Sequence, residues 1–155
     1  MGLGIIKFQN ALKKLKKVGL DSSILIYHLE DMEPYANLTE NIFAMVAEGS
    51  LSAVLSTVSV TELLVQPFTA SQQDRIAAFE RFLFSLPNTE LKSPDYPIAK
   101  EAARLRSKYR IRTPDALLIA TFMNEKADAF ITNDASLRAL RAEGVTVLGL
   151  ADFVR

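Results

Sequence analysis

Along this chain of 155 residues, short apolar runs typical of strands alternate with segments whose apolar positions have the period of a helix. Short runs of β-branched and small apolar residues predict strands, and apolar positions that recur every three or four residues predict helices. The predicted strands span 18–21, 51–58, 89–91, 128–132 and 145–148, and the predicted helices span 24–29, 38–48, 59–65, 71–86, 97–109, 113–126 and 135–143. Strands and helices therefore alternate over most of the chain.

Local signals support several of the predicted helix ends. Ser22 and the serine after it are suited to cap the helix over 24–29. Thr113, followed by proline and an acid, has the composition of a helix start, with the threonine as the capping residue. Gly49 is placed to end one helix, and Pro67 is expected to end the helix that contains Glu62.

Alternating strands and helices predict βαβ units, with parallel strands and helices on both faces of one sheet. We therefore expect an α/β fold, a three-layer α/β/α sandwich, in a single domain over residues 1–155. Residues 1–17 form a basic extension with Ile5, Phe8 and Leu12 near helical spacing. We interpret this extension as an extra surface helix, in preference to a helix that contacts a membrane surface or RNA.

Composition excludes several classes of site. The chain has no cysteine, so disulfides, thiolate zinc sites and cysteine nucleophiles are excluded, and a reducing cytoplasm is the expected location. The N-terminal residues are not typical of a signal peptide, and no apolar run is long enough to span a membrane. The formal net charge is zero, which neither favours nor excludes a nucleic-acid partner.

Four acidic residues occupy equivalent places in this pattern. Asp21 ends the first predicted strand, and Asp134 follows the strand over 128–132. Glu62 and Asp115 each lie in the first turn of a predicted helix. Because crossover helices begin at the edge where parallel strands end, all four side chains are expected to project toward one rim of the sheet.

Each acid also has an explanation that needs no active site. Asp21 and Asp134 are suited to cap or begin a helix, and Ser59 and Glu62 have the spacing of a capping box. Asp115 at a helix start is favoured by the helix dipole. Taken together, however, two carboxylates about 4 Å apart repel by roughly 4 kcal/mol at an effective dielectric near 20. Protonation, basic side chains or a cation must offset that repulsion.

The residue types favour a hard cation at this rim. Carboxylate oxygens suit Mg²⁺ or Mn²⁺, whereas zinc is disfavoured without thiols or a histidine cluster. The one histidine, His28, is interpreted as a partly buried helix residue. Such a site suits phosphodiester hydrolysis, with Asp21 and Asp115 as metal ligands, and with Glu62 and Asp134 completing the shell, orienting waters or accepting a proton.

The segments VGLDSSILIYHLE, STVSVTELL, TPDALLIATFMNEKADAFITND and VTVLGLADF resemble the ordered motifs of PIN domains, in particular of VapC-type toxins. The resemblance runs from about Val18 to the C-terminus. It implies a three-layer α/β/α fold with a parallel sheet of about five strands and a magnesium- or manganese-dependent endoribonuclease. Asp21, Glu62, Asp115 and Asp134 match the four acids of the family.

The resemblance also implies supporting residues and partners. Ser22, Thr132 and Asn133 are expected to hold the acids or their waters, and a small antitoxin protein and a homodimer are the expected partners besides RNA. In the basic run before Asp115, Arg112 is the best candidate to hold an RNA phosphate or to balance the acids. Phe68 and Phe84 are equally consistent with a partner surface and with packing in the core.

Three alternative functions compete with the nuclease. The first is a PIN-fold RNA- or protein-binding module without catalysis, against which the presence of all four acids argues. A phosphate-signalling receiver domain needs adjacent acids and a late lysine, but Asp21 is followed by serines and the strand over 145–148 has no lysine. A dinucleotide-binding enzyme needs a glycine-rich turn after the first strand, which this chain lacks.

Overall fold

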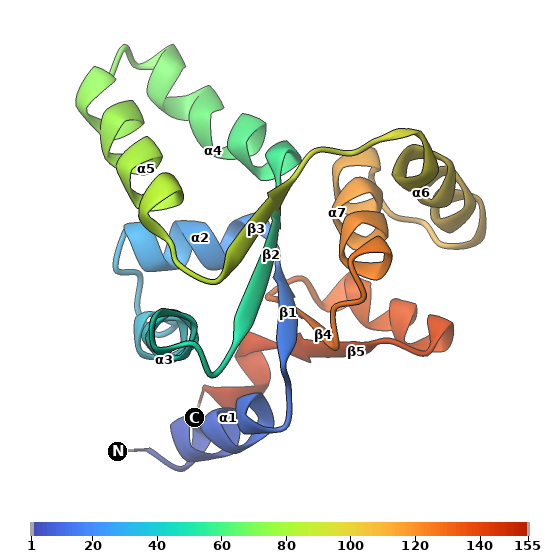
Figure 1. Ribbon diagram of the computed structural model, residues 1–155, viewed down its shortest axis with the longest axis horizontal. Helices are drawn as coiled ribbons and strands as arrows, with labels where there is room; N and C mark the ends of the chain where they lie inside the picture. The colour runs from blue at the N-terminus through green and yellow to red at the C-terminus, as the bar shows by residue number, and fades with distance from the viewer. Residues whose placement is uncertain (1, 155) are drawn as a thin grey trace.

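The computed structural model describes residues 2–154 and contains one parallel sheet with helices on both faces (Figure 1). The strands are β1 (Lys17–Leu20), β2 (Ser52–Ser56), β3 (Thr89–Lys92), β4 (Ala129–Thr132) and β5 (Thr146–Gly149). They form a 5-stranded sheet in the order β3-β2-β1-β4-β5, and each neighbouring pair is parallel. The predicted fold class is confirmed.

The helices lie close to the predicted ranges. They are α1 (Leu3–Lys13), α2 (Ser22–Leu29), α3 (Ala36–Glu48), α4 (Thr57–Thr69), α5 (Gln73–Ser85), α6 (Tyr96–Lys108) and α7 (Thr113–Asn124), with the 3-10 helices η1 (Ala135–Glu143) and η2 (Leu150–Phe153). The helix predicted over 135–143 is present, and its winding is that of a 3-10 helix. Leu137 and Leu140, three residues apart, are both buried there, and the tighter 3-10 winding places such residues on one side.

The predicted start and end of α4 are wrong. The helix begins at Thr57, because the Ser56 hydroxyl caps it by accepting from Val58 N at 3.1 Å. At its other end α4 continues through Pro67 to Thr69. Proline costs the helix one backbone hydrogen bond. Pro67 is buried where α4 packs against α5, and this packing holds the last turn in place.

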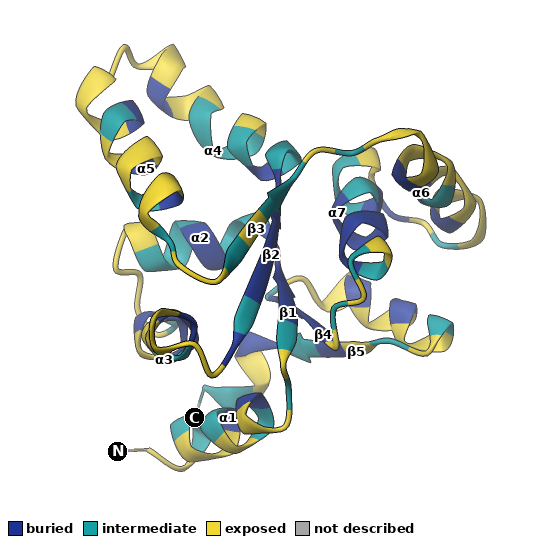
Figure 2. Cartoon of the chain, in the orientation of Figure 1, coloured by how far each residue is buried: buried dark blue, intermediate teal, exposed yellow. Residues whose placement is uncertain are grey.

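Each strand contributes side chains to both faces of the sheet, as the period of two requires. Val18 and Leu20 of β1 point to the face covered by α1, α2, α3 and α5. Val54 and Phe130 point to the opposite face, which is covered by α6, α7 and η1. Figure 2 shows the buried residues concentrated along the central strands and on the sides of the helices that face them. The core therefore forms two layers, one on each side of the sheet.

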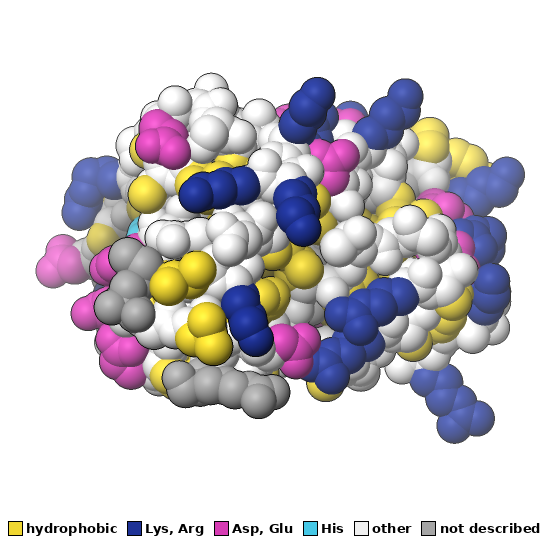
Figure 3. All heavy atoms as spheres, turned by 90° about the horizontal axis from the view of Figure 1, so that it is seen from below, with side chains coloured by type: hydrophobic (Ala, Val, Ile, Leu, Met, Phe, Trp, Pro, Cys, Tyr) yellow, Lys and Arg dark blue, Asp and Glu magenta, His cyan; other side chains and the backbone are white. Residues whose placement is uncertain are grey.

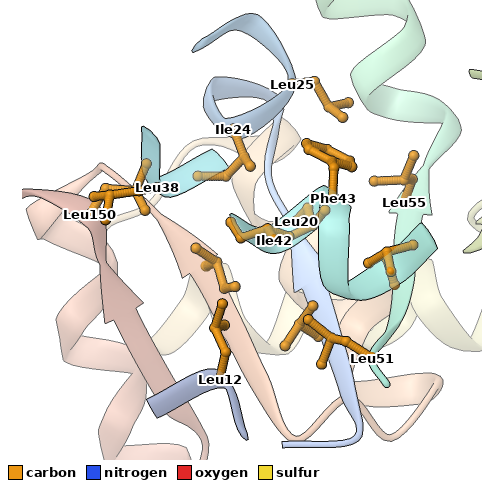
Figure 4. Packing of buried hydrophobic residues seen from close by; sticks show 14 of the residues in the cluster. Leu12, Leu20, Ile24, Leu25, Leu38, Ile42, Phe43, Leu51, Leu55 and Leu150 are labelled. Atoms are coloured by element: carbon orange, nitrogen blue, oxygen red, sulfur yellow. The ribbon is translucent and has the colours of Figure 1, made fainter. Parts of the chain in front are cut away.

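The N-terminal helix is part of the packed fold. Phe8 and Leu12 of α1 are fully buried, and Leu12 lies in the same core as Leu150 of η2 (Figure 4). Gly4 allows the start of α1 to lie directly against the backbone of η2, because a Cβ at that position would collide with the carbonyl oxygen of Phe153. Within the predicted extension over residues 1–17, the helix spans residues 3–13 and its apolar side packs in the core, and Met1 lies outside the described residues.

Lys and Arg side chains are scattered over the face seen from below in Figure 3, with apolar and uncharged atoms between them. None of the helices between residues 2 and 154 has the length and apolar character needed to cross a membrane. His28, as expected, is a half-buried helix residue whose ring lies 4.3 Å from that of Phe43, centroid to centroid.

Candidate active site

Asp21 lies immediately after β1 and caps α2. Its Oδ1 accepts hydrogen bonds from the backbone N of Ser23 at 3.0 Å and of Ile24 at 3.4 Å, and from the Ser23 hydroxyl at 2.5 Å. Its Oδ2 accepts from the hydroxyl of Thr132, the last residue of β4. The predicted serine caps are therefore replaced by the aspartate itself, because its carboxylate reaches the first free amides of the helix.

Burial raises the pKa of the Asp21 carboxyl above its ordinary value, and the hydrogen bonds from Ser23 and Thr132 offset only part of this effect. Asp21 is the one acidic or basic residue that is buried in the described part of the chain. Thr132 is itself 1% exposed and accepts from Asp134 N at 3.0 Å. One hydroxyl thus fixes Asp21 and the backbone of Asp134 relative to each other.

Glu62 lies in the second turn of α4, not in the first turn as predicted. Ser59 and Glu62 do not form the capping box that was the alternative explanation for Glu62, because Ser56 is the cap. The Glu62 carboxylate instead accepts a hydrogen bond from the Ser22 hydroxyl, Oγ to Oε1 at 2.6 Å. Glu62 therefore faces the start of α2, where Asp21 lies.

Asp115 lies in the first turn of α7 and forms an ion pair with Arg112, Nε to Oδ2 at 3.3 Å. Thr113 begins this helix but does not cap it, contrary to expectation. Its hydroxyl accepts from Arg106 Nη1 at 2.9 Å, and Arg106 Nε also donates to the carbonyl of Ile111 at 3.0 Å. Arg106 of α6 thereby fixes the segment that presents Asp115.

Asp134 caps η1 by accepting from Ser136 N at 2.9 Å and from the Ser136 hydroxyl at 2.7 Å. Asn133, beside it, links two further elements. Its Nδ2 donates to the hydroxyl of Tyr27 in α2 at 3.0 Å, and its Oδ1 accepts from Ala151 N in η2 at 3.1 Å. Asn133 thus holds the strand end that carries Asp134 against both neighbours.

The four acids line one pocket of about 400 Å³ at the carboxyl ends of the strands. Its lining comprises Asp21, Ser22, Ser23, Tyr27, Glu62, Arg112, Asp115, Leu118, Asn133 and Asp134. Thr132 is not part of the lining and supports Asp21 from below. The pocket residues come from α2, α4, α7 and the segment after β4, which are far apart in the sequence and meet at one sheet edge (Figure 1).

The carboxylates share the pocket without converging on a point. Within residues 2–154, no three acidic, histidine or cysteine side chains stand close enough to hold a metal ion as they are placed. Each carboxylate instead has its own partner: a hydroxyl for Asp21, Glu62 and Asp134, and a guanidinium for Asp115.

Sequence reasoning did not assign Tyr27 or Ser59 to the site. Tyr27 lines the pocket through its place on α2, and its ring stacks on that of Tyr35 with centroids 4.6 Å apart. Ser59 is 1% exposed and contacts Ser22. Helical spacing is the signal that could have found both residues. Ser59 lies three residues before Glu62 in α4, and Tyr27 lies four residues after Ser23, which lines the pocket, in α2.

The family model of the PIN domain matches residues 18–143. No curated protein matches the chain. Among solved structures, the chain is similar to VapBC2 from Rickettsia felis bound to a DNA fragment from their promoter, with 14% identity and a TM-score of 0.67 over 86% of this chain and 98% of that one.

Two further structures show the same fold. FitAcB from Neisseria gonorrhoeae is 19% identical, with a TM-score of 0.65 over 86% of this chain and 98% of that chain. A toxin-antitoxin complex from Klebsiella pneumoniae is 20% identical, with a TM-score of 0.62 over 86% of this chain and 97% of that chain. At these identities the structural similarity shows the fold alone. The family is shown by the PIN family model, which matches residues 18–143, most of the sequence. The chain belongs to the PIN domain family.

Proposed function

We propose that this protein is an endoribonuclease that hydrolyses RNA phosphodiester bonds with the help of Mg²⁺ or Mn²⁺. The observation that supports this proposal most directly is that Asp21, Glu62, Asp115 and Asp134 line one pocket at the carboxyl edge of the parallel sheet. Members of the PIN family are generally nucleases, and ligands of such sheets bind at this edge.

The chemistry of the lining fits a hard divalent cation. The pocket offers four carboxylates together with hydroxyl and amide oxygens, and neither cysteine nor histidine lines it. The raised pKa of Asp21 shows that its hydrogen bonds do not fully offset the cost of burying its charge. A nearby cation would favour the ionised form. The carboxylates would have to leave their separate partners for this, because no three of them stand close enough to share an ion within residues 2–154.

The roles follow from the position of each residue. Asp21, fixed by Ser23 and Thr132, and Asp115 on α7 would hold the cation from two sides of the pocket. When bound, the cation would lower the pKa of a coordinated water and stabilise charge on the phosphate. Glu62 and Asp134 would complete the shell, orient that water or accept its proton.

Arg112 is the residue most suited to bind the RNA backbone. Among residues 2–154 it is the one basic side chain that lines the pocket, and its side chain is 74% exposed. A guanidinium can leave a carboxylate for a phosphate without losing its charge. Arg112 would thus hold the phosphate next to the one that is cut.

We further infer that the protein is the toxin of a toxin–antitoxin pair. Its structural neighbours include complexes described as toxin-antitoxin or VapBC assemblies. The sequence was equally consistent with a partner surface and with core packing for Phe68 and Phe84. These residues are 60% and 73% exposed, so neither fills the core. Exposed aromatic side chains of this kind favour protein interfaces, and a small antitoxin or a second copy of the chain is the expected occupant.

The second candidate is a PIN-fold binding module without catalysis. The lack of a converged metal site in the described residues is the observation that would favour it. Incubation of the purified protein with total RNA separates the two. The nuclease proposal expects cleavage with Mn²⁺ and none with excess EDTA, whereas a binding module would retain intact RNA under both conditions.

A further inference from the structure

Ser59 carries a buried hydroxyl that contacts Ser22, a residue of the pocket lining, and does not line the pocket itself. It lies in α4 one turn before Glu62 and is 1% exposed. Its Oγ lies 2.8 Å from the Oγ of Ser22, and this is its one side-chain hydrogen bond within the described residues. The Ser22 Oγ in turn lies 2.6 Å from Glu62 Oε1. Three side chains from two helices are therefore linked in series.

The direction of these hydrogen bonds follows from counting protons. An ionised carboxylate only accepts, so Ser22 must donate its single hydroxyl proton to Glu62. Ser22 then has only lone pairs to offer to Ser59, and Ser59 must be the donor in the bond between the two hydroxyls. The order is Ser59 to Ser22 to Glu62, and each bond polarises the next.

We propose that Ser59 is a positioning residue of the active site, which acts through Ser22 to fix the carboxylate of Glu62. This inference rests on the proposed function, in which Glu62 faces the cation and its water. The Glu62 side chain has three rotatable torsions, and the Ser22 hydroxyl can turn freely about its C–O bond. The proton of Ser59 removes that freedom, because it leaves Ser22 one favourable direction for its own proton.

A purely structural role for Ser59 makes a different prediction. If its hydroxyl only joined α2 to α4, its removal would lower stability and leave Glu62 undisturbed. Ser56 provides a matched control, since it is also buried in the same region and caps the same helix through Val58 N. Ser56 has no hydrogen bond to Ser22 or Glu62 within the described residues.

The test compares Ser59→Ala, Ser22→Ala and the double variant in a double-mutant cycle, with Ser56→Ala as the control. The first readout is the ¹³Cδ resonance of Glu62 in the metal-free protein at neutral pH. We expect Ser59→Ala to shift this resonance, and to have no further effect once Ser22 is alanine. Ser56→Ala should lower the melting temperature and leave the resonance in place.

The second readout is the Kd for Mn²⁺, measured by titration calorimetry. We expect Ser59→Ala to raise it about tenfold, as is typical of residues that orient metal ligands. In the Ser22→Ala background, Ser59→Ala should alter the Kd for Mn²⁺ by less than about twofold. An unmoved Glu62 resonance, or equal effects in both backgrounds, would overturn the inference. If the wild type binds no Mn²⁺, the nuclease proposal fails, and the resonance still decides whether Ser59 positions Glu62.

Discussion

Arg112 pairs with Asp115 across 3.3 Å, Nε to Oδ2, at the rim of the acidic pocket. The two side chains differ in exposure, at 74% for the arginine and 15% for the aspartate. The carboxylate is therefore largely enclosed, whereas the guanidinium is accessible from solvent. Under the proposed function, this exposed positive charge is available to a phosphate of the RNA backbone.

We predict that Arg112→Gln weakens RNA binding without weakening the binding of Mn²⁺. The loss of one phosphate contact should reduce the slope of log K against log salt by about one, similarly for all RNA sequences. Arg110→Gln is the matched control, because Arg110 is exposed two residues away and does not line the pocket. Fluorescence anisotropy at several salt concentrations measures the slope. An unchanged slope for Arg112→Gln would remove this residue from the RNA site.

We predict that divalent metal stabilises the fold through Asp115. At a Mn²⁺ concentration 100 times Kd, linkage gives about 2.7 kcal/mol, which for a chain of this size corresponds to roughly 5–10 °C in melting temperature. The gain should be largely absent in Asp115→Asn, because that variant lacks one of the proposed ligands. Differential scanning calorimetry with and without MnCl₂ measures it. An equal gain in both proteins would place the metal elsewhere.

Glu143, a carboxylate that does not line the pocket, predicts a dependence of stability on pH. Glu143 accepts hydrogen bonds from Arg104 at 2.6 Å, Tyr109 at 2.6 Å and Lys108 at 3.0 Å. These bonds, with that from Arg104 the largest cause, lower the pKa of Glu143 from 4.5 to about 2. The ionised carboxylate therefore stabilises the fold fully above pH 4.5, and this stabilisation is lost as the pH falls toward 2.

Glu143→Gln should accordingly melt below the wild type at neutral pH, and the difference should shrink between pH 4.5 and 2. Thermal melts followed by circular dichroism across this range measure the difference. A difference in melting temperature that stays constant down to pH 2 would mean that the ionisation of Glu143 does not contribute to stability.

The central strand that ends at Asp21 depends on a glycine. A Cβ at Gly19 would collide with the ring of Phe122 in α7. We predict that Gly19→Ala destabilises the protein by about 1–3 kcal/mol, the usual cost of overpacking a core. Urea unfolding measures this cost, and in a Phe122→Leu background the same substitution should cost less. If the cost is the same in both backgrounds, the strain does not come from this contact.

The fold and the placement of the four acids along one pocket could be predicted from the sequence because both depend on periodicity. Once the strands are parallel, Asp21 and Asp134 must lie at the same edge, and the helix that begins near Thr113 must bring Asp115 there. The predictions that failed are those in which local signals compete. Ser59 is a good capping residue by composition, but Ser56 is nearer to the strand end and caps the helix first.

The partners of the acids could not be predicted, because they are set by tertiary packing. The bond from Thr132 to Asp21 joins residues 111 positions apart, and the bond from Ser22 to Glu62 joins residues 40 positions apart. The exposure of Phe68 could not be predicted either, because it too is set by tertiary packing. Helical spacing could not decide whether this side chain would meet a neighbouring helix, and 60% of it remains exposed.

The measurement closest to the central claim is the rate of Mn²⁺-dependent RNA cleavage by Asp115→Asn. Asp74→Asn is the matched control, since Asp74 also lies in the first turn of a helix and is exposed away from the pocket. The account predicts a loss of more than about 100-fold for Asp115→Asn, with an intact fold, and a wild-type rate for Asp74→Asn. Cleavage by Asp115→Asn at the wild-type rate would contradict it.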